Sequence, residues 1–302
     1  MIFLIQKHPI PKRLFLLHAD TPTRAHDLCL PYESPALCAG RSSLSPFQTA
    51  RVIYALWCRK GRTDDECWSD FFRDVCRFRQ GTGEIAFALS VEDLRLLSGD
   101  LSRLAVLRAA GVRSAIPFWQ GENPLGGAWD TEIGLSDFGE AAIGRCFESG
   151  LVPDVSHASR KSCDAILGMG ETRGLPVIAS HVGFDALCRH GRNLTDSDAS
   201  RIASLGGLIG ITFHAPHLTA SGRADLSDVV SHIRYGFSRF PRAIALGSDF
   251  DGTEKTPDGL FSASDLPALA EALYETGFTE EDVDAVFYSN AAHFFDAAGI
   301  PT

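Results

Sequence analysis

The stretch that decides the fold is Leu14-Phe15-Leu16-Leu17-His18-Ala19-Asp20, in which a short apolar run ends in a histidine and a carboxylate two residues apart. Short apolar runs separated by helical stretches are typical of buried parallel strands. The same arrangement recurs along the chain, where further apolar runs lead to Glu92, His157, His181 and Asp249. In a closed parallel barrel the carboxyl ends of the strands meet on one face, where active sites lie. The sequence therefore predicts that these side chains converge there and form a metal site.

The alternation of strand-like and helix-like segments predicts an α/β fold, a (β/α)8 TIM barrel. The strand-like runs cover 14–17, 51–58, 85–91, 114–118, 152–156, 176–180, 207–213 and 243–248. The helix-like runs cover 64–78, 100–110, 136–149, 160–168, 195–205, 225–238 and 264–276, and a terminal helix is expected near 280–288. The chain contains no repeat and no linker-like stretch, so we expect residues 1–302 to form a single domain.

Four long segments follow predicted strands: 21–50, 119–134, 214–224 and 252–263. They come after the first, fourth, seventh and eighth strands, so all four are expected over the same end of the barrel. Loops at that end carry the substrate-binding groups of barrel enzymes. The pattern predicts that this face is built for a substrate.

Composition excludes several classes of protein. The 302 residues are 45% hydrophobic and 22% charged, as in a globular protein with a sizeable core. A formal charge of −10 disfavours nucleic acid as a partner, because phosphate binding needs a basic surface. The apolar stretch Met1–Ile5 is too short for a secretory signal or a membrane span. We therefore expect a cytoplasmic protein without a membrane partner, whose eight cysteines are free thiols.

The polar residues at the strand ends suit zinc. Each alone is ordinary, since most single histidines are core or surface residues. Together they offer nitrogen and oxygen ligands, which bind zinc without any thiolate. Five ligands exceed the tetrahedral demand of one zinc ion and favour two ions about 3.5–4 Å apart. Glu92 is the natural bridge because a carboxylate has two oxygens to share. The predicted ligands are His18, Asp20, Glu92, His157 and His181.

Two further residues are candidates for the chemistry. Asp249 lies in Gly247-Ser248-Asp249-Phe250-Asp251-Gly252, where a carboxylate beside a metal-bound water could accept its proton. The alternative, an aspartate in a turn before glycine, describes Asp251 better. Arg192 follows His181 by eleven residues, and its guanidinium could bind a substrate carboxylate through two hydrogen bonds. The alternative for Arg192 is a surface arginine that flanks a helix.

Four segments carry a resemblance to a known family. They are Asp154-Val155-Ser156-His157, Pro176-Val177-Ile178-Ala179-Ser180-His181, Arg192-Asn193-Leu194 and Gly247-Ser248-Asp249-Phe250-Asp251-Gly252. In order and spacing they resemble the membrane (renal) dipeptidase family of binuclear zinc peptidases, within the amidohydrolase superfamily. The resemblance extends from about Leu14 to about Phe295.

The resemblance implies a dipeptidase with two Zn²⁺ ions per monomer, bridged by Glu92 and a hydroxide. His18 and Asp20 would bind one ion with Glu92, and His157 and His181 would bind the other with Glu92. Arg192 would hold the terminal carboxylate of a dipeptide, whose second residue can have the D configuration, and Asp249 would transfer the proton. The resemblance also implies a homodimer.

The chain departs from the family at two places. Asp93 follows the bridging glutamate, where the family usually has glycine, and this adds a negative charge near the metals. The segment Trp119-Gln120-Gly121-Glu122-Asn123 lacks a histidine that some members place there against the scissile carbonyl. We expect Trp119, Gln120 and Asn123 to contact the substrate in its place.

Two alternatives to a dizinc dipeptidase stay open. The altered residues at 93 and 119–123 allow another amidohydrolase on the same metals, acting on an N-acyl amino acid, a cyclic amide or a metabolite-linked peptide bond, because a fold does not fix a substrate. The second alternative is a catalytically dead zinc-binding relative. The intact ligands and Asp249 argue against it.

Overall fold

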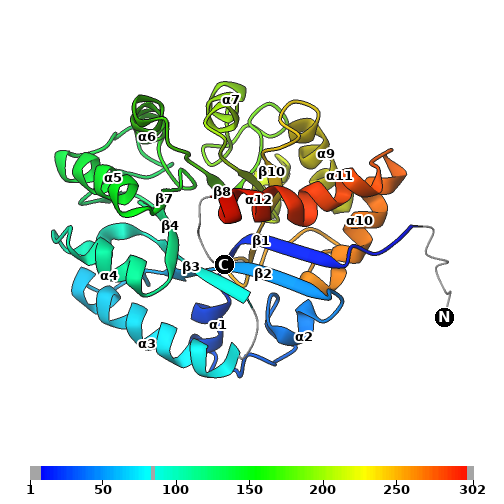
Figure 1. Ribbon diagram of the computed structural model, residues 1–302, viewed down its shortest axis with the longest axis horizontal. Helices are drawn as coiled ribbons and strands as arrows, with labels where there is room; N and C mark the ends of the chain where they lie inside the picture. Colours follow the sequence, from blue (N-terminus) through cyan, green and yellow to red (C-terminus); the bar gives the residue numbers. More distant parts are fainter. Residues whose placement is uncertain (1–7, 83–85, 298–302) are drawn as a thin grey trace.

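Eight parallel strands form the centre of the computed structural model, which describes residues 8–82 and 86–297. Their order in space is β7-β4-β3-β2-β1-β10-β9-β8 (Figure 1). The strands are β1 (Arg13–Ala19), β2 (Thr49–Trp57), β3 (Ala86–Glu92), β4 (Val112–Ile116), β7 (Val152–Pro153), β8 (Ala179–Val182), β9 (Ile209–Thr212) and β10 (Ile244–Phe250).

The two end strands of this order also meet, and the sheet closes into the predicted TIM-like barrel. Asp154 forms a parallel bridge with Ile178. The Ile178 amide donates to the Pro153 carbonyl at 3.0 Å, and the Val155 amide donates to the Ile178 carbonyl at 2.8 Å. Strands β7 and β8 are shorter than the sequence predicts. Where these two strands meet, the chain pairs through the isolated Asp154–Ile178 bridge instead of a continuous ladder.

Helices surround the strands, close to the predicted ranges (Figure 1). The Ser136 side chain caps the helix that follows it by accepting a hydrogen bond from the Gly139 amide. Gly150 ends that helix at φ +70°, a conformation that glycine adopts without a Cβ penalty. The surrounding helices are α3 (Asp64–Thr82), α4 (Arg103–Ala109), α5 (Asp137–Ser149), α6 (Arg160–Arg173), α7 (Asp196–Ser204), α9 (Leu226–Phe237) and α10 (Leu266–Glu275).

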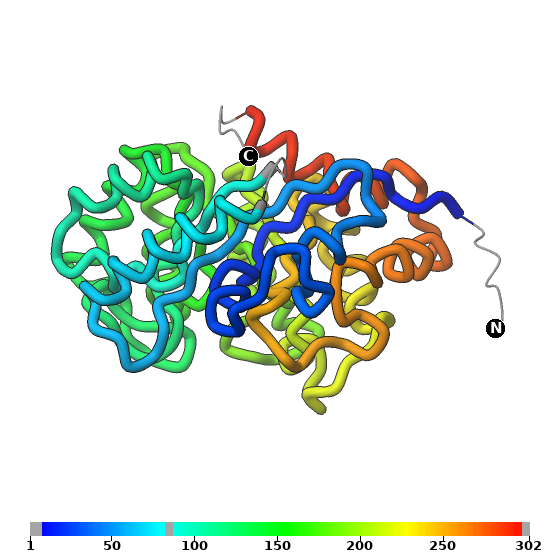
Figure 2. The backbone as a smooth tube through the Cα atoms, turned by 90° about the horizontal axis from the view of Figure 1, so that it is seen from below, coloured from blue at the N-terminus to red at the C-terminus, as the bar shows by residue number. Residues whose placement is uncertain are grey.

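The terminal segment closes one end of the barrel. The expected helix near 280–288 begins as α11 (Glu280–Asp284), continues through the π-turn η3 (Ala285–Ser289) and runs into α12 (Asn290–Ala297). The Phe295 ring stacks on Phe15 of β1, with ring centroids 5.5 Å apart. Buried side chains from the strands and from α12 thus form an inner core at this end, separate from the larger core between strands and helices. Figure 2 shows α12 at one edge of the molecule and the 214–224 segment at the opposite edge.

The long loops contain short elements that the sequence pattern did not predict. The segment after β1 includes α1 (Thr21–Asp27) and α2 (Arg41–Leu44). The segment after β4 forms a hairpin of β5 (Glu122–Asn123) and β6 (Gly126–Gly127). Short helical turns complete the loops: η1 (Leu94–Leu97) after β3, α8 (Ala215–Leu218) after β9 and η2 (Ala263–Asp265) before α10.

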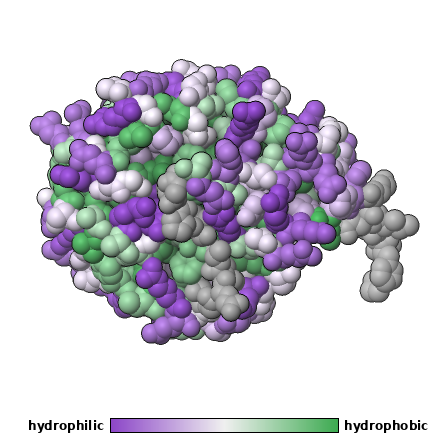
Figure 3. All heavy atoms as spheres, viewed as in Figure 1, coloured by the Kyte–Doolittle hydropathy of each residue, from purple (hydrophilic) through white to green (hydrophobic). Residues whose placement is uncertain are grey.

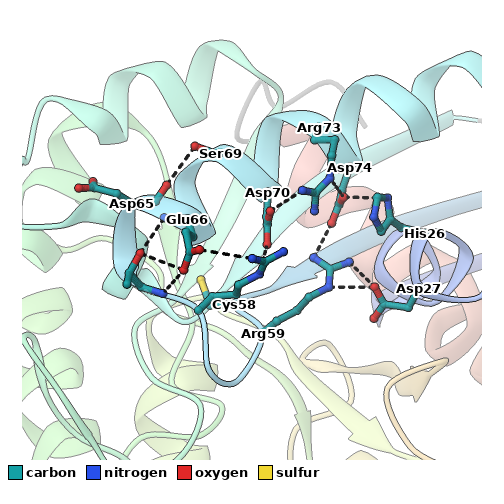
Figure 4. Close-up of polar contacts among 12 residues, drawn as sticks. His26, Asp27, Cys58, Arg59, Asp65, Glu66, Ser69, Asp70, Arg73 and Asp74 are labelled. Carbon is teal, nitrogen blue, oxygen red and sulfur yellow. Dashed lines mark hydrogen bonds and ion pairs between the residues drawn. The ribbon is translucent and has the colours of Figure 1, made fainter.

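Ion pairs fasten α1 to α3 (Figure 4). Arg59, in the loop after β2, contacts Asp27 of α1 at 2.7 Å and Asp74 of α3 at 2.7 Å. The Asp74 side chain is only 2% exposed and also lies 3.1 Å from Nδ1 of His26. Because α1 directly follows Asp20, this cluster fixes the chain that leaves the barrel beside the predicted ligands.

All eight cysteines are free thiols, as expected. No helix within the described residues is long and apolar enough to cross a bilayer. Hydrophilic side chains are spread over the face seen in Figure 3, with apolar patches between them. The predicted cytoplasmic location stays a prediction, and the Met1–Ile5 stretch on which it depends lies outside the described residues.

Candidate metal centre

The predicted metal ligands lie together at the carboxyl ends of the strands. His18 lies near the end of β1, Glu92 is the last residue of β3, and His181 belongs to β8. Asp20 follows β1, and His157 follows β7 by four residues. All five side chains are buried. The ligand atoms of His18, Asp20 and Glu92 lie within 4.8 Å of one another, and so do those of Glu92, His157 and His181.

Glu92 is common to both groups, and its two oxygens face different partners. Its Oε2 atom lies 3.5 Å from Nε2 of His18, which is in turn 3.2 Å from Oδ2 of Asp20. Its Oε1 atom lies 2.8 Å from Nε2 of His157 and 4.0 Å from Nε2 of His181. A carboxylate in this position can hold two cations, one on each oxygen.

The orientation of His157 tests whether these residues fit a cation. Its Nδ1 atom lies 2.7 Å from the carbonyl oxygen of Trp119, which can only accept, so Nδ1 carries the hydrogen. In the neutral ring Nε2 then presents a lone pair to Glu92 Oε1 and, at 3.0 Å, to Nε2 of His181. His157 Nε2 and the Glu92 carboxylate are then two acceptors 2.8 Å apart, and a cation bound by both would reconcile them. Metal-binding histidines use their second nitrogen in this way, as donor to a carbonyl.

Electrostatics lead to the same conclusion. Burial and the neighbouring Glu92 raise the pKa of Asp20 to about 7. Burial and the neighbouring Asp20 raise the pKa of Asp249 well above its ordinary value. Burial, with Arg192 nearby, lowers the pKa of His157 to about 4, so this ring gives no positive charge at neutral pH. Although burial opposes the shift, Asp20 and Glu92 raise the pKa of His18 well above its ordinary value, so one imidazolium faces the carboxylates of Asp20 and Glu92. Divalent cations would replace that proton and neutralise the carboxylates.

Asp249 is held against the metal ligands by an unusual backbone. Ser248 and Asp249 have φ values of +65° and +76°, in the left-handed region that costs non-glycine residues of order 1–3 kcal/mol. The Ser248 hydroxyl donates to the His18 carbonyl, and this contact anchors the strained turn to β1. The carboxylate of Asp249 lies within 4.8 Å of the ligand atoms of His18 and His181. A Cβ on Gly252 would lie 2.2 Å from Asp20 Oδ2 and 2.6 Å from Asp249 Oδ1, so only glycine fits there.

A cavity of about 400 Å³ opens over the centre. The predicted substrate residues Trp119, Gln120 and Arg192 line it, together with Asp249. Asn123 is not among the residues that line the cavity: its Nδ2 atom donates to Asp93 and to the Pro117 carbonyl. The lining residues that the sequence prediction did not name include the aromatic and imidazole side chains of Trp57, Trp129, His214 and His217.

The sequence pattern contained a signal for the two histidines that were not predicted. His214 and His217 follow β9 within five residues, so the rule that selected the other strand-end residues also covers them. Their rings lie 4.4 Å apart, and the His217 ring lies 4.7 Å from that of His190. Burial, together with Arg192, lowers the pKa of His214 to about 4. These neutral rings therefore surround the Arg192 side of the cavity without adding charge.

Arg192 reaches the cavity from the loop after β8. The residue is only 5% exposed, and its Nη1 atom has no hydrogen-bond partner among the described residues. Burial lowers the pKa of its guanidinium to about 10, which leaves the group charged at neutral pH. A buried, charged donor without a partner costs free energy unless a ligand satisfies it. This part of the cavity is suited to an anionic group.

Comparison with known proteins identifies relatives of this chain. The family described as membrane dipeptidase (peptidase family M19) matches residues 73–299. The uncharacterized protein in the pqqA 5′ region of Klebsiella pneumoniae is 33% identical over 219 residues, which are 68% of this chain and 79% of that protein. Dipeptidase aclJ of Aspergillus oryzae is 31% identical over 220 residues, 70% of this chain but 51% of that enzyme, so the chain spans about half of its length.

A solved structure shares the fold. It is a metallo peptidase from Rhodobacter sphaeroides, liganded with a phosphinate mimic of the dipeptide L-Ala-D-Ala. The likeness covers 98% of this chain and 100% of that one, with a TM-score of 0.82 and 18% sequence identity.

Proposed function

The chain belongs to the membrane dipeptidase family, a family of metallo-dipeptidases, and on this premise we propose that it is a binuclear zinc dipeptidase. The observation that carries the proposal is the position of Glu92 between two ligand groups. One oxygen of this carboxylate faces His18, and the other faces His157 and His181. A single ion would leave one of these groups without a partner in a buried place, which is unfavourable. Two zinc ions satisfy both.

Zinc ions at this position would polarise the scissile carbonyl and lower the pKa of the attacking water. The residues of the chain do the rest. Asp249 lies beside the ligands His18 and His181, where it can take the proton of the attacking water. The same carboxylate then returns the proton to the amide nitrogen, which leaves poorly unless it is protonated. The contact of the Ser248 hydroxyl with the His18 carbonyl anchors the turn that carries Asp249 beside these ligands.

Arg192 gives the reaction its preference for dipeptides. Arg192 lines the cavity together with Glu92 and Asp249, and its Nη1 atom is buried without a hydrogen-bond partner among the described residues. A guanidinium binds a carboxylate in a planar, two-pronged geometry, so a free C-terminus is the matching substrate group. A cavity of about 400 Å³ suits a small ligand. The Rhodobacter sphaeroides neighbour, which binds a mimic of L-Ala-D-Ala, supports dipeptides with a D-residue at the second position as substrates. We further propose a single-domain protein that acts as a homodimer.

The test is hydrolysis by the zinc-loaded protein. Dipeptides that vary the C-terminal residue and its chirality are compared with the same compounds as C-terminal amides and with N-acyl amino acids. We expect cleavage of free dipeptides and weak cleavage of the amides. Cleavage of N-acyl amino acids or cyclic amides alone would favour the other amidohydrolase reaction. Bound zinc without turnover of any compound would favour the catalytically dead relative.

A further inference from the structure

We propose that Asp93 is a positioning residue that ties together the three loops around the metal centre. The inference rests on the proposed function, since it concerns the orientation of a ligand in that site. Asp93 follows Glu92 directly and is 6% exposed, yet it lines no part of the cavity. Its φ of +82° lies in a region that favours glycine, so a side chain is retained there at a cost in backbone strain. The contacts of that side chain give the reason.

The carboxylate of Asp93 connects the loop after β3 to the loop after β4. Its Oδ1 atom accepts hydrogen bonds from Asn123 Nδ2 at 2.7 Å and from the Arg95 amide at 3.0 Å. Asn123 Nδ2 also donates to the Pro117 carbonyl at 2.8 Å, and Asn123 Oδ1 accepts from the Leu125 amide at 2.8 Å. Every polar atom of the Asn123 side chain is thus engaged in holding the 117–125 segment on Asp93.

The same residue connects to the loop after β2. Oδ2 of Asp93 lies 3.4 Å from Nε of Arg95. The Arg95 guanidinium donates to the carbonyls of Arg59 and Arg62, both at 2.8 Å. The Cys58 thiol donates to the carbonyl of Asp93 at 3.1 Å. Asp93 therefore lies where the loops after β2, β3 and β4 meet.

The segment that Asp93 holds ends at the metal centre. Trp119 lies between Pro117 and Asn123, and its carbonyl accepts the hydrogen of His157 Nδ1. Its ring lies 5.0 Å from that of Trp57, which is the last residue of β2 and also lines the cavity. Displacement of this segment would release the carbonyl that fixes the ring orientation of His157. Loss of such an outer partner lowers metal affinity by about 10–100-fold in comparable sites.

Two substitutions at position 93 distinguish the contribution of the side chain from that of the backbone conformation. Asp93→Gly relieves the positive φ but removes both hydrogen bonds, whereas Asp93→Asn keeps an oxygen that can accept them. Asn123→Ala removes the same link from the other side without touching the residue beside Glu92. Asp100→Gly is the matched control, because Asp100, farther along the loop after β3, also accepts a hydrogen bond from an amide two residues on, but its side chain is exposed.

The readouts are deuterium uptake of residues 117–129 and the affinity for Zn²⁺ in competition with a chromophoric chelator. We expect Asp93→Gly and Asn123→Ala to raise the uptake and to weaken zinc binding by about tenfold or more. Asp93→Asn and Asp100→Gly should stay close to the wild type, and dipeptide turnover should rank the variants in the same order. The double variant Asp93→Gly, Asn123→Ala should be no worse than the worse single one, because both break one link.

Unchanged uptake and zinc affinity in Asp93→Gly would overturn the inference, and so would an Asp93→Asn protein as impaired as the glycine variant. A wild type that cleaves no dipeptide would contradict the proposed function instead. In that case the exchange and zinc measurements still decide the role of Asp93, because neither requires turnover.

Discussion

The carbonyl oxygen of Trp119 lies 2.7 Å from Nδ1 of His157. This contact assigns the hydrogen of the ring to Nδ1 and leaves Nε2 free to bind a metal ion. We expect the zinc-loaded protein to show His157 with a protonated Nδ1 and a metal-bound Nε2. Nitrogen-15 NMR of the imidazole groups measures this directly. A hydrogen on Nε2 in the loaded protein would mean that His157 is not a ligand through that atom.

Zinc stoichiometry tests the shared role of Glu92. The two ligand groups predict two zinc ions per monomer, measured by elemental analysis after dialysis. Glu92→Gln should lower the occupancy of both sites, because the bridge loses an anionic oxygen that each ion would use. A stoichiometry near one in the wild type, or a Glu92→Gln protein that loses only one ion, would contradict the bridge.

Substrate selection tests Arg192. Arg192→Ala should raise KM for free dipeptides far more than for their C-terminal amides, since only the free carboxylate can pair with the guanidinium. Arg192→Lys should rescue little, because an ammonium group cannot reproduce the planar, two-pronged contact. Steady-state kinetics on matched dipeptide and amide pairs give the comparison. Equal effects on both compounds would show that Arg192 does not touch the carboxylate.

Asp249→Asn separates proton transfer from metal binding. The substitution preserves size and polarity but removes the group that cycles the proton. General acid–base catalysis is worth about 10²–10⁴-fold in rate, so kcat should fall by at least that factor while zinc content stays near two. Loss of zinc in proportion to activity would make Asp249 a ligand. Full turnover with full zinc would assign the proton to another base, and Asp251 is the next candidate.

The free energy of unfolding tests the contribution of the ion pairs seen in Figure 4. Arg59→Met leaves the buried Asp74 with fewer cationic partners, and breaking a buried pair costs about 3–5 kcal/mol. Because His26 and Arg73 stay near Asp74, we expect a loss toward the lower end of that range, measured by urea unfolding. Arg145→Met is the matched control: Arg145 is 54% exposed and pairs with Glu148, which is 62% exposed, and exposed pairs contribute about 0–1 kcal/mol. Similar losses in the two variants would contradict the argument.

The sequence by itself determined the barrel and the kind of site. Strand-end positions were enough to predict that five polar side chains lie together, because parallel strands must deliver their carboxyl ends to one face. These residues are His18, Asp20, Glu92, His157 and His181. Alternation of apolar runs with amphipathic segments located the helices to within a few residues, except at α6, which extends to Arg173, and at the terminal segment, which runs on to Ala297. These features depend on the local sequence pattern and on the topology, and both can be inferred from the order of the residues.

Only the tertiary structure decided how the loops meet. The pattern gave no sign that Asn123 bonds to Asp93 and lies outside the cavity lining, or that His217 lies beside His190, because such contacts join segments far apart in sequence. The left-handed backbone at His157 and Asp249 was equally hidden, since it costs a non-glycine residue free energy that only the tertiary surroundings can offset. Periodicity reports which side of an element is buried. The orientation of a side chain in a loop depends on partners that meet only after the barrel has closed.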